Sequence, residues 1–366
     1  MDFNFKYPTL DLQYLIHKAT TSNGKEELRK HLISNNMSTM YSNLISKKVL
    51  QDNKQDILLI KESKQKKISD LLELKDKDPE NSSYIKSIDI QIAELYAHFM
   101  DTEEALEICK NILRDENSFS LQMDIYLCRM RIGMLTKNKK LLEENVNLAN
   151  DCCEMGCDWD RRNKFKIYKA IYHLSKGSFK ESGQFFSESL PSFEKNEVID
   201  FKNAVEYLIF CGLLTFERVN IKKHLLDCPE VLEIGNKESI ELIRSMYECN
   251  YYEFLPNLYK YLVTVKDDFY LYKFIDFFCK EMKIKIYRQL LNSYQSIDLK
   301  NMADLFGIEV EFLENDLASF IVEKRISCKI DKISNTIVID EEEYNGIKDI
   351  ADEGSNLMKI IKNSIN

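Results

Sequence analysis

The sequence predicts a mainly α-helical protein in which a solenoid of helical repeats precedes a winged helix with a small antiparallel sheet, followed by a final helix. Three observations predict this class. Only 5 prolines and 10 glycines interrupt 366 residues, which is sparse for a sheet-rich chain with many tight turns. A helix-pair pattern recurs between residues 88 and 193. Residues 296–340 follow the order helix, helix, hairpin.

Residues 1–80 are predicted to form an N-terminal helical region with charged faces. Its many lysines would by themselves suggest a patch that binds nucleic acid. Acidic residues offset them, so a solvated helix face is the better interpretation. These acidic residues are Asp52, Asp56, Glu62, Asp70, Glu73, Asp76 and Asp78. Pro79 then ends the region.

Residues 81–195 are predicted to form helical repeats. The segments "AELYAHFMDTEEALEICKNIL" (93–113) and "AIYHLSKGSFKESGQFFSESL" (170–190) share one template, and a degraded copy lies at 130–151. The template aligns Ala105 with Ser182 and places Glu143 at the same position of the middle copy. Small residues at fixed points let two helices approach closely, as in tetratricopeptide-like (TPR-like) solenoids.

The single tryptophan opens the third helix pair, in "DWDRR" (158–162). This cluster is either a corner that binds a partner or a structural joint between repeats. We favour the joint. Asp158 or Asp160 is expected to cap the helix N-terminus, and Trp159 to wedge into the preceding pair. Arg161 and Arg162 remain to pair with acidic neighbours.

Residues 196–342 begin with helices rich in Phe and Tyr, which we interpret mainly as core. The winged helix is predicted at about 296–340. Its first helix ends at Gly307, and a second apolar stripe runs from Phe312 to Ile321. The alternating "ISCKID" and "TIVID" then form a hairpin around the turn Ser334–Asn335.

Residues 343–366 are predicted to form a C-terminal helix. An apolar stripe beyond the last folded unit suggests that this helix docks onto other helices. The candidate interface residues of the stripe are Ile347, Ile350, Leu357, Met358 and Ile361.

Charge and hydropathy argue against nucleic-acid and membrane partners. The formal net charge is −9. The segment Leu299–Arg325 carries six carboxylates against three cations, so docking it on a duplex would bury carboxylates against phosphates. The longest apolar run, Tyr207–Phe216, is half of the ~20 residues that a membrane-spanning helix needs. The N-terminus has no signal-peptide pattern, so we expect a soluble intracellular protein.

The sequence shows no catalytic constellation. The five histidines are isolated, and no H-E-x-x-H, G-x-S-x-G, P-loop or G-x-G-x-x-G motif occurs. The dense cysteine cluster Cys152, Cys153 and Cys157 has no matching Cys or His pair at zinc-site spacing. We therefore expect no enzyme activity, no cofactor and no metal, and instead a surface that binds partner proteins.

Five segments carry a resemblance to a known family: "NNMSTMY" (35–41), "DWDRRNKFKIY" (158–168), "SMYECNYYEFL" (245–255), "YRQLLNSYQSIDLKNMADLFGIEVEFLENDLASFI" (287–321) and "CKIDK" (328–332). They resemble the PCI proteins, which are scaffold subunits of the proteasome lid, the cullin-deconjugating signalosome and a translation initiation complex. Within that group the chain is most similar to the family of the seventh non-ATPase lid subunit. The resemblance covers nearly the whole chain, and the first signalosome subunit matches less well.

The resemblance implies a non-catalytic lid scaffold in which residues 196–342 form the PCI domain. Winged-helix sheets of neighbouring subunits would join edge to edge, here through the strand residues Thr336, Ile337, Val338 and Ile339. The C-terminal stripe would enter a bundle of helices from many subunits, and the solenoid would reach the ATPase ring of the base. A small acidic lid subunit would be a further partner.

The expected locations are the cytoplasm and the nucleus. The alternatives are a PCI scaffold of the signalosome, and a winged-helix nucleic-acid-binding protein. A short segment between the wing and the last helix and a degenerate middle repeat depart from the family pattern.

Overall fold

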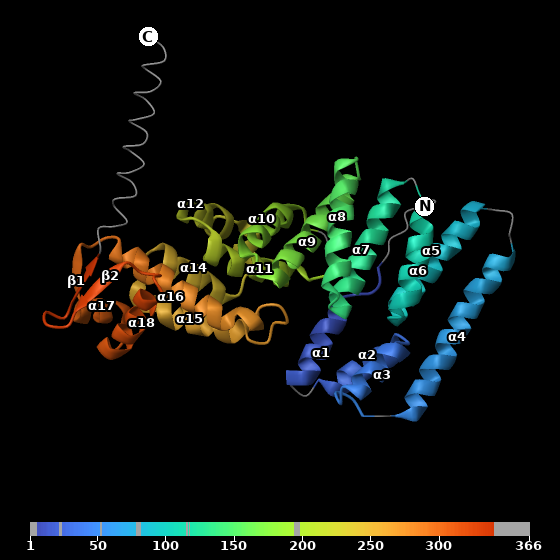
Figure 1. The fold of residues 1–366 in the computed structure, drawn as a ribbon, viewed down its shortest axis with the longest axis horizontal. Coiled ribbons are helices and arrows are strands. Elements are labelled where there is room, and N and C mark those ends of the chain that lie inside the picture. Colours follow the sequence, from blue (N-terminus) through green and yellow to red (C-terminus); the bar gives the residue numbers. More distant parts are fainter. Residues whose placement is uncertain are drawn as a thin grey trace, which may run out of the picture. The chain divides into compact units, whose positions relative to one another are not determined.

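The computed structural model describes residues 6–21, 24–51, 53–77, 82–114, 116, 118–193 and 198–339. The chain divides into two compact units (Figure 1). Unit 1 combines the chain up to Phe216 with Asp227–Gly235 and Asp267–Tyr272. Unit 2 holds Glu217–Leu226, Asn236–Lys266 and the chain from Lys273 onward. The predicted fold class, mainly helical with a small antiparallel sheet near the C-terminus, is confirmed.

Unit 1 consists of helices, and three pairs of them form its central part (Figure 1): α5 with α6, α7 with α8, and α9 with α10. Short connections join the two helices of each pair, as expected for helical repeats. The helices are α1 (Asp11–Thr21), α2 (Lys25–Ser34), α3 (Ser38–Ser46), α4 (Lys54–Lys77), α5 (Ser82–Phe99), α6 (Thr102–Arg114), α7 (Phe119–Thr136), α8 (Lys139–Glu154), α9 (Trp159–Lys176), α10 (Phe179–Ser189), the 3-10 turn η1 (Leu190–Ser192), α11 (Phe201–Thr215) and α13 (Pro229–Ile234).

Small residues set the distance between paired helices. Ala105 and Ser182 are fully buried, and the Ser182 hydroxyl donates to the carbonyl of Ala170 at 2.9 Å. The prediction that Glu143 takes this position in the middle pair is wrong, because Glu143 is exposed and Leu142 is the buried residue. Helix α8 begins at Lys139, which places Leu142 at the fourth helical position, where α6 has Ala105 and α10 has Ser182.

The middle pair obtains its close approach from the opposite helix. A Cβ atom at Gly133 of α7 would lie 3.3 Å from the backbone nitrogen of Leu142. The backbones of α7 and α8 therefore approach each other closely at Gly133 and Leu142. At the equivalent positions, the outer pairs have a large residue on the first helix, Tyr96 or His173, and a small residue on the second. Exchanging the small and the large side chain preserves the packing of the repeat.

The segment before α1 lies on the repeats of unit 1. The carbonyl oxygen of Tyr7 accepts a hydrogen bond from Arg131 Nη2 at 3.1 Å and from Cys128 Sγ at 3.5 Å. The ring of Tyr7 meets the ring of His98 edge-on, with centroids 4.0 Å apart. Arg131 is almost completely buried and also donates to the hydroxyl of Tyr168. Hydrogen bonds to α7 and a ring contact with α5 thus fix this segment.

A second polar cluster ties α1 to α11. The hydroxyls of Tyr14 and Tyr207 lie 2.7 Å apart, and Tyr207 donates to Asp268 at 2.8 Å. The hydroxyl of Tyr270 donates to Gln13 at 3.1 Å. Buried hydroxyls without partners would cost stability, so these bonds fix α1 against α11 and the segment Asp267–Tyr272.

The described part of unit 2 contains a winged helix, as predicted, in the order α16, β1, α17, α18, β2, β3 (Figure 1). The first strand, Ser296–Asp298, was not foreseen from the sequence. The elements of unit 2 are α12 (Arg218–Ile221), the π-helix η2 (Lys222–Leu226), α14 (Lys237–Tyr247), α15 (Tyr251–Val265), α16 (Ile275–Leu291), β1 (Ser296–Asp298), α17 (Leu299–Phe306), α18 (Val310–Val322), β2 (Cys328–Asp331) and β3 (Thr336–Ile339). The 3-10 turn η3 (Tyr272–Phe274) lies at the boundary of the two units.

Aromatic side chains form the core beneath the winged helix. Phe306 is buried between Tyr251, with ring centroids 5.3 Å apart, and Tyr287, with centroids 4.9 Å apart. Gly307 ends α17 with φ at +64°, a conformation in which glycine is favoured. Most of the apolar stripe predicted for α18 is buried, through Leu313, Leu317 and Phe320. Its first residue is not, because Phe312 is 42% exposed.

Candidate interaction surfaces

The strand order of the sheet is β1–β3–β2, so β3 is the central strand. Ile337 pairs with Ile297 of β1 on one side and with Ile330 of β2 on the other. The prediction that Thr336, Ile337, Val338 and Ile339 form a free edge is therefore wrong. Their backbone N–H and C=O groups are used by the two neighbouring strands, and strand addition to β3 is blocked.

The free edges of the sheet belong to β1 and β2. Within residues 198–339, no strand pairs with the outer side of either one. The β2 edge spans Cys328–Asp331 and the β1 edge Ser296–Asp298. Strand β3 can still contribute side chains, because Val338 is exposed on one face while Ile337 is buried on the other. Backbone groups at a strand edge are available to a strand of another chain.

The tip of the wing presents an apolar side chain on a rigid turn. The carboxylate of Asp331 accepts the backbone N–H of Ile333 at 2.9 Å and the hydroxyl of Ser334 at 2.6 Å. These bonds hold the pKa of Asp331 below its usual value. Ile333 itself is 97% exposed. A large aliphatic side chain held in solvent by an ordered turn is a candidate anchor for a partner.

Two cations at the winged helix, Lys283 and Arg325, are engaged in ion pairs within unit 2. Asp316 of α18 accepts from Lys283 at 2.9 Å and from Tyr287 at 3.2 Å, both on α16. Arg325 makes a two-pronged pair with Glu281, at 2.7 and 2.6 Å. These groups fasten α18 and the start of the wing to α16, and α18 itself carries no cation. The helix that would lie in a DNA groove therefore presents carboxylates, which phosphates repel.

The cluster around Trp159 differs from the predicted joint. Trp159 is the first residue of α9 and is 64% exposed, so the prediction that it wedges into the preceding helix pair is wrong. Asp158 stands at the N-cap position, but its carboxylate makes no capping bond. Instead it accepts from the hydroxyl of Ser120 at 2.6 Å and from Arg161 at 2.8 Å. Asp160 is exposed in the first turn of α9.

Arginines, not the indole, connect α9 to the preceding pair. Arg161 donates to both oxygens of the buried Asp124 on α7, at 3.0 and 2.8 Å. Arg162 donates to the carbonyls of Cys153 and Cys157, at 3.3 Å each. Burial raises the pKa of Asp124, and the guanidinium of Arg161 offsets part of that rise. A lone aspartate in the apolar stretch "LQMDIYLC" was the sequence signal for this buried pair.

Among the described residues, the cysteines form no disulfide and belong to no group that could hold a metal ion. All ten cysteines lie in the described part of the chain and are free thiols. Burial raises the pKa of Cys152 to about 12, so its thiol is protonated at neutral pH. No group of three or more His, Cys, Asp or Glu side chains among the described residues is arranged to hold a metal ion. None of the described helices is long and apolar enough to cross a membrane.

The predicted C-terminal interface lies outside the described residues. It comprises Ile347, Ile350, Leu357, Met358 and Ile361. Its docking role stays a prediction, as does the partner role of the wing.

Helical repeats together with a winged helix define a PCI protein, and the comparisons agree. The PCI domain family model matches residues 258–341, and the model of the 26S proteasome subunit RPN7 matches residues 56–224. The chain is 31% identical over 284 residues to the 26S proteasome non-ATPase regulatory subunit 6 of Dictyostelium discoideum, which covers 76% of this chain and 74% of that protein. This chain therefore belongs to the family of the 26S proteasome subunit RPN7.

Two further relatives show how far the similarity extends. The chain is 29% identical over 331 residues to the 26S proteasome regulatory subunit RPN7 of Saccharomyces cerevisiae, covering 89% of this chain and 76% of that protein. Subunit 1 of the COP9 signalosome complex of Arabidopsis thaliana is 27% identical over 177 residues, or 46% of this chain and 39% of that protein. The signalosome similarity is thus confined to less than half of the chain.

Proposed function

We propose that this chain is a non-catalytic scaffold subunit of the 26S proteasome regulatory particle, in the lid. The observation that carries the proposal is membership of the RPN7 family over most of the chain, together with a winged helix whose sheet has two free edges. Its role is to join neighbouring subunits and so to support the degradation of ubiquitinated proteins. The partners implied are other PCI subunits of the lid, the small acidic lid subunit and the ATPase ring of the base.

The sheet joins neighbouring subunits through β1 and β2. A strand of the next PCI subunit pairs with the outer edge of β2 or of β1, and the exposed Ile333 enters an apolar pocket of that subunit. Main-chain hydrogen bonds give such strand addition its affinity, and side-chain pockets give it specificity. Ile333→Asp should weaken association with the neighbouring subunit without lowering thermal stability. Val219→Asp, at an exposed valine of α12, is the matched control.

The C-terminal stripe joins a bundle of helices from other subunits. Ile350→Asp combined with Ile361→Asp should leave the isolated chain folded and block its incorporation into the lid, because a helix bundle cannot accommodate unpaired buried charges. Normal incorporation on a native gel would contradict this docking role.

The scaffold positions the deubiquitinase of the lid, which another subunit carries, over the substrate entry path. Cleavage of ubiquitin chains by the purified chain alone would contradict the non-catalytic role. We further propose that the protein resides in the cytoplasm and the nucleus, which fluorescence microscopy of a tagged copy tests.

The decisive experiment is affinity purification of the tagged full-length chain under native conditions, followed by quantitative mass spectrometry. Peptidase-ring, ATPase and lid subunits in comparable amounts are the expected result. Recovery of signalosome subunits in their place would favour the related signalosome scaffold. Salt-sensitive binding to a DNA duplex in a gel shift would favour a winged-helix nucleic-acid-binding protein instead.

A further inference from the structure

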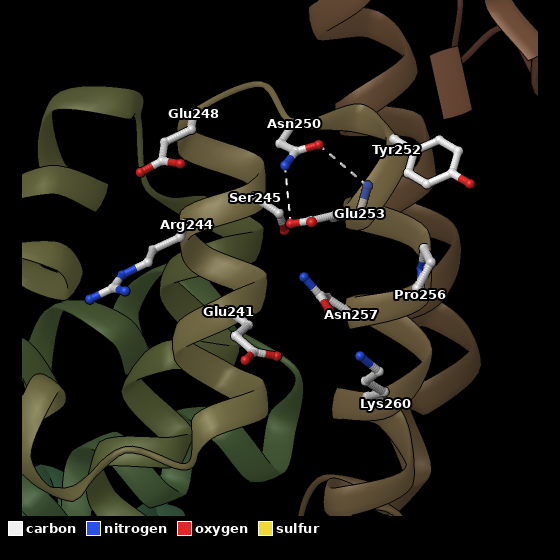
Figure 2. A pocket seen from close by; sticks show the side chains of 10 residues that line it. All are labelled: Glu241, Arg244, Ser245, Glu248, Asn250, Tyr252, Glu253, Pro256, Asn257 and Lys260. Carbon is white, nitrogen blue, oxygen red and sulfur yellow. Dashed lines mark hydrogen bonds between the residues drawn. The ribbon is translucent and has the colours of Figure 1, made fainter. Parts of the chain in front are cut away.

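A groove of about 400 Å³ lies between α14 and α15 of unit 2 (Figure 2). Its volume falls in the range of ~300–1,000 Å³ that is typical of small-ligand sites. Glu241 and Ser245 line it from α14, and Glu253, Asn257 and Lys260 line it from α15. Neither the fold nor the proposed scaffold role accounts for polar side chains converging between these two helices.

Asn257 is the central feature of the groove. The residue is only 7% exposed, and Figure 2 shows its side-chain amide pointing into the space between the helices. Within the described residues, its side chain has no hydrogen-bond partner. Its amide nitrogen and oxygen still reach solvent, so water in the groove hydrates them. The amide also offers N–H donors and a C=O acceptor side by side, which matches the C=O and N–H groups of an extended peptide backbone.

The two ends of the groove carry different charges. Glu253 lies one turn before Asn257 and is fixed by its neighbour Asn250, whose Nδ2 donates to Glu253 Oε2 at 3.0 Å. Lys260 lies almost one turn after Asn257 and makes no ion pair within the described part of unit 2. Glu241 lines the groove from the opposite helix. Its ion-pair partner Lys237 lies 3.6 Å away, and the lysine side chain is strongly exposed.

We infer that this groove binds a short extended segment of another protein that carries a basic side chain. The amide of Asn257 pairs with one peptide unit of that segment. The basic side chain lies at the Glu253 end, because a fixed carboxylate attracts it there and Lys260 repels it from the other end. This inference concerns a surface separate from the sheet edges and does not depend on assembly into the lid.

The test uses the purified full-length chain and a random peptide library displayed on phage. Selected peptides are synthesised, and their Kd values are measured by fluorescence polarisation. We expect enrichment of peptides with Lys or Arg. Asn257→Leu removes the donor and the acceptor at similar volume, and should weaken binding at least about tenfold. Its melting temperature should stay close to that of the wild type, because no hydrogen bond within the protein is lost and the amide of Asn257 still reaches solvent.

Two further variants keep the test decisive. Asn315→Leu makes the same substitution on the exposed face of α18 in the same unit and should leave binding unchanged. Glu253→Gln keeps the backbone cap of α15 and should weaken basic peptides, and it decides the question if Asn257→Leu does not fold. The inference is overturned if no peptide is enriched, if acidic peptides are preferred, or if neither Asn257→Leu nor Glu253→Gln changes the Kd.

Discussion

The pair between Arg161 and Asp124 should be the main stabilising contact between α7 and α9 at the Trp159 cluster. The substitution Arg161→Met keeps most of the aliphatic stem and removes the two hydrogen bonds to Asp124, at 3.0 and 2.8 Å. Asp124 then remains buried as a carboxylate without its cation. Breaking a buried ion pair in this way costs ~3–5 kcal/mol.

The expected magnitude lies at the low end of that range. The side chain of Arg161 is 20% exposed and that of Asp124 is 8% exposed, so water relieves part of the penalty and about 3 kcal/mol remains. A unit of this size loses roughly 2–4 °C in Tm for each kcal/mol. Thermal denaturation at pH 7 should therefore show a fall of about 6–12 °C for Arg161→Met.

Two neighbouring substitutions serve as controls. Asp158→Ala removes an ion pair whose carboxylate is largely exposed, and exposed pairs contribute little to stability. Trp159→Ala removes a side chain that is 64% exposed, so it lacks the penalty of a core truncation. Both should lower Tm much less than Arg161→Met. Equal falls for Arg161→Met and Asp158→Ala would refute the reasoning.

The pH dependence provides a second signature of the same pair. Burial raises the pKa of Asp124 and Arg161 lowers it, so Arg161→Met raises the folded-state pKa further above the unfolded value of 3.8. A carboxyl group with a raised folded-state pKa destabilises the fold at high pH and ceases to do so as pH falls. Arg161→Met should thus regain stability relative to wild type between pH 7 and pH 4. Adding Asp124→Asn should abolish that recovery.

Three further predictions concern packing and titration, each measured by thermal denaturation. Gly133→Ala should lower Tm by an amount equivalent to about 1 kcal/mol, because its new Cβ would lie 3.3 Å from the backbone of Leu142. The cost of this close contact exceeds the gain in helix propensity. Gly307→Ala should cost about 1–2 kcal/mol, because φ is +64° and its Cβ would lie 2.6 Å from Tyr252. An unchanged Tm would contradict either one. Burial lowers the pKa of His98 to about 4, so the wild type should lose stability between pH 6.5 and 4, and His98→Phe should reduce that loss.

The sequence predicted the winged helix well because its signals are local. Gly307 ends one amphipathic helix, the stripe from Phe312 to Ile321 follows at helical spacing, and a turn separates two alternating segments. Strand β1 was missed because it has only three residues, of which Ile297 alone is buried. Such a short segment carries no measurable alternation.

Strand order could not be predicted, because it depends on contacts distant in the sequence. Strand β3 is central because it pairs with β1, which lies some 40 residues earlier in the sequence, as well as with β2. Ser296 of β1, for example, pairs with Val338 of β3. Nothing in "TIVID" distinguishes an edge strand from a central one. Correcting the order moves the expected interface from the backbone of β3 to the outer edges of β1 and β2.

The candidate joint shows the same limit at the level of single side chains. The sequence identified the charged residues of this cluster, but it predicted that Trp159 packs against the preceding helix pair. In the structure Arg161 makes that contact and Trp159 is exposed. Trp159 is the first residue of α9 and is exposed. Arg161, two residues later in the same turn, faces α7 and reaches Asp124. Helical phase within one turn decided the outcome, and a cap position can shift that phase by one residue.

The acidic character of the winged helix has a structural cause that also limits its function. Asp316 fixes α18 to Lys283 and Tyr287 of α16, and Glu281 fixes the start of the wing through Arg325. Converting this helix into a reader of phosphate would require cations at positions where carboxylates now hold the subdomain together. On the winged helix, the sheet edges offer unpaired backbone groups, and the wing tip offers the exposed apolar side chain of Ile333. Those groups suit the strand of another protein rather than a charged polymer.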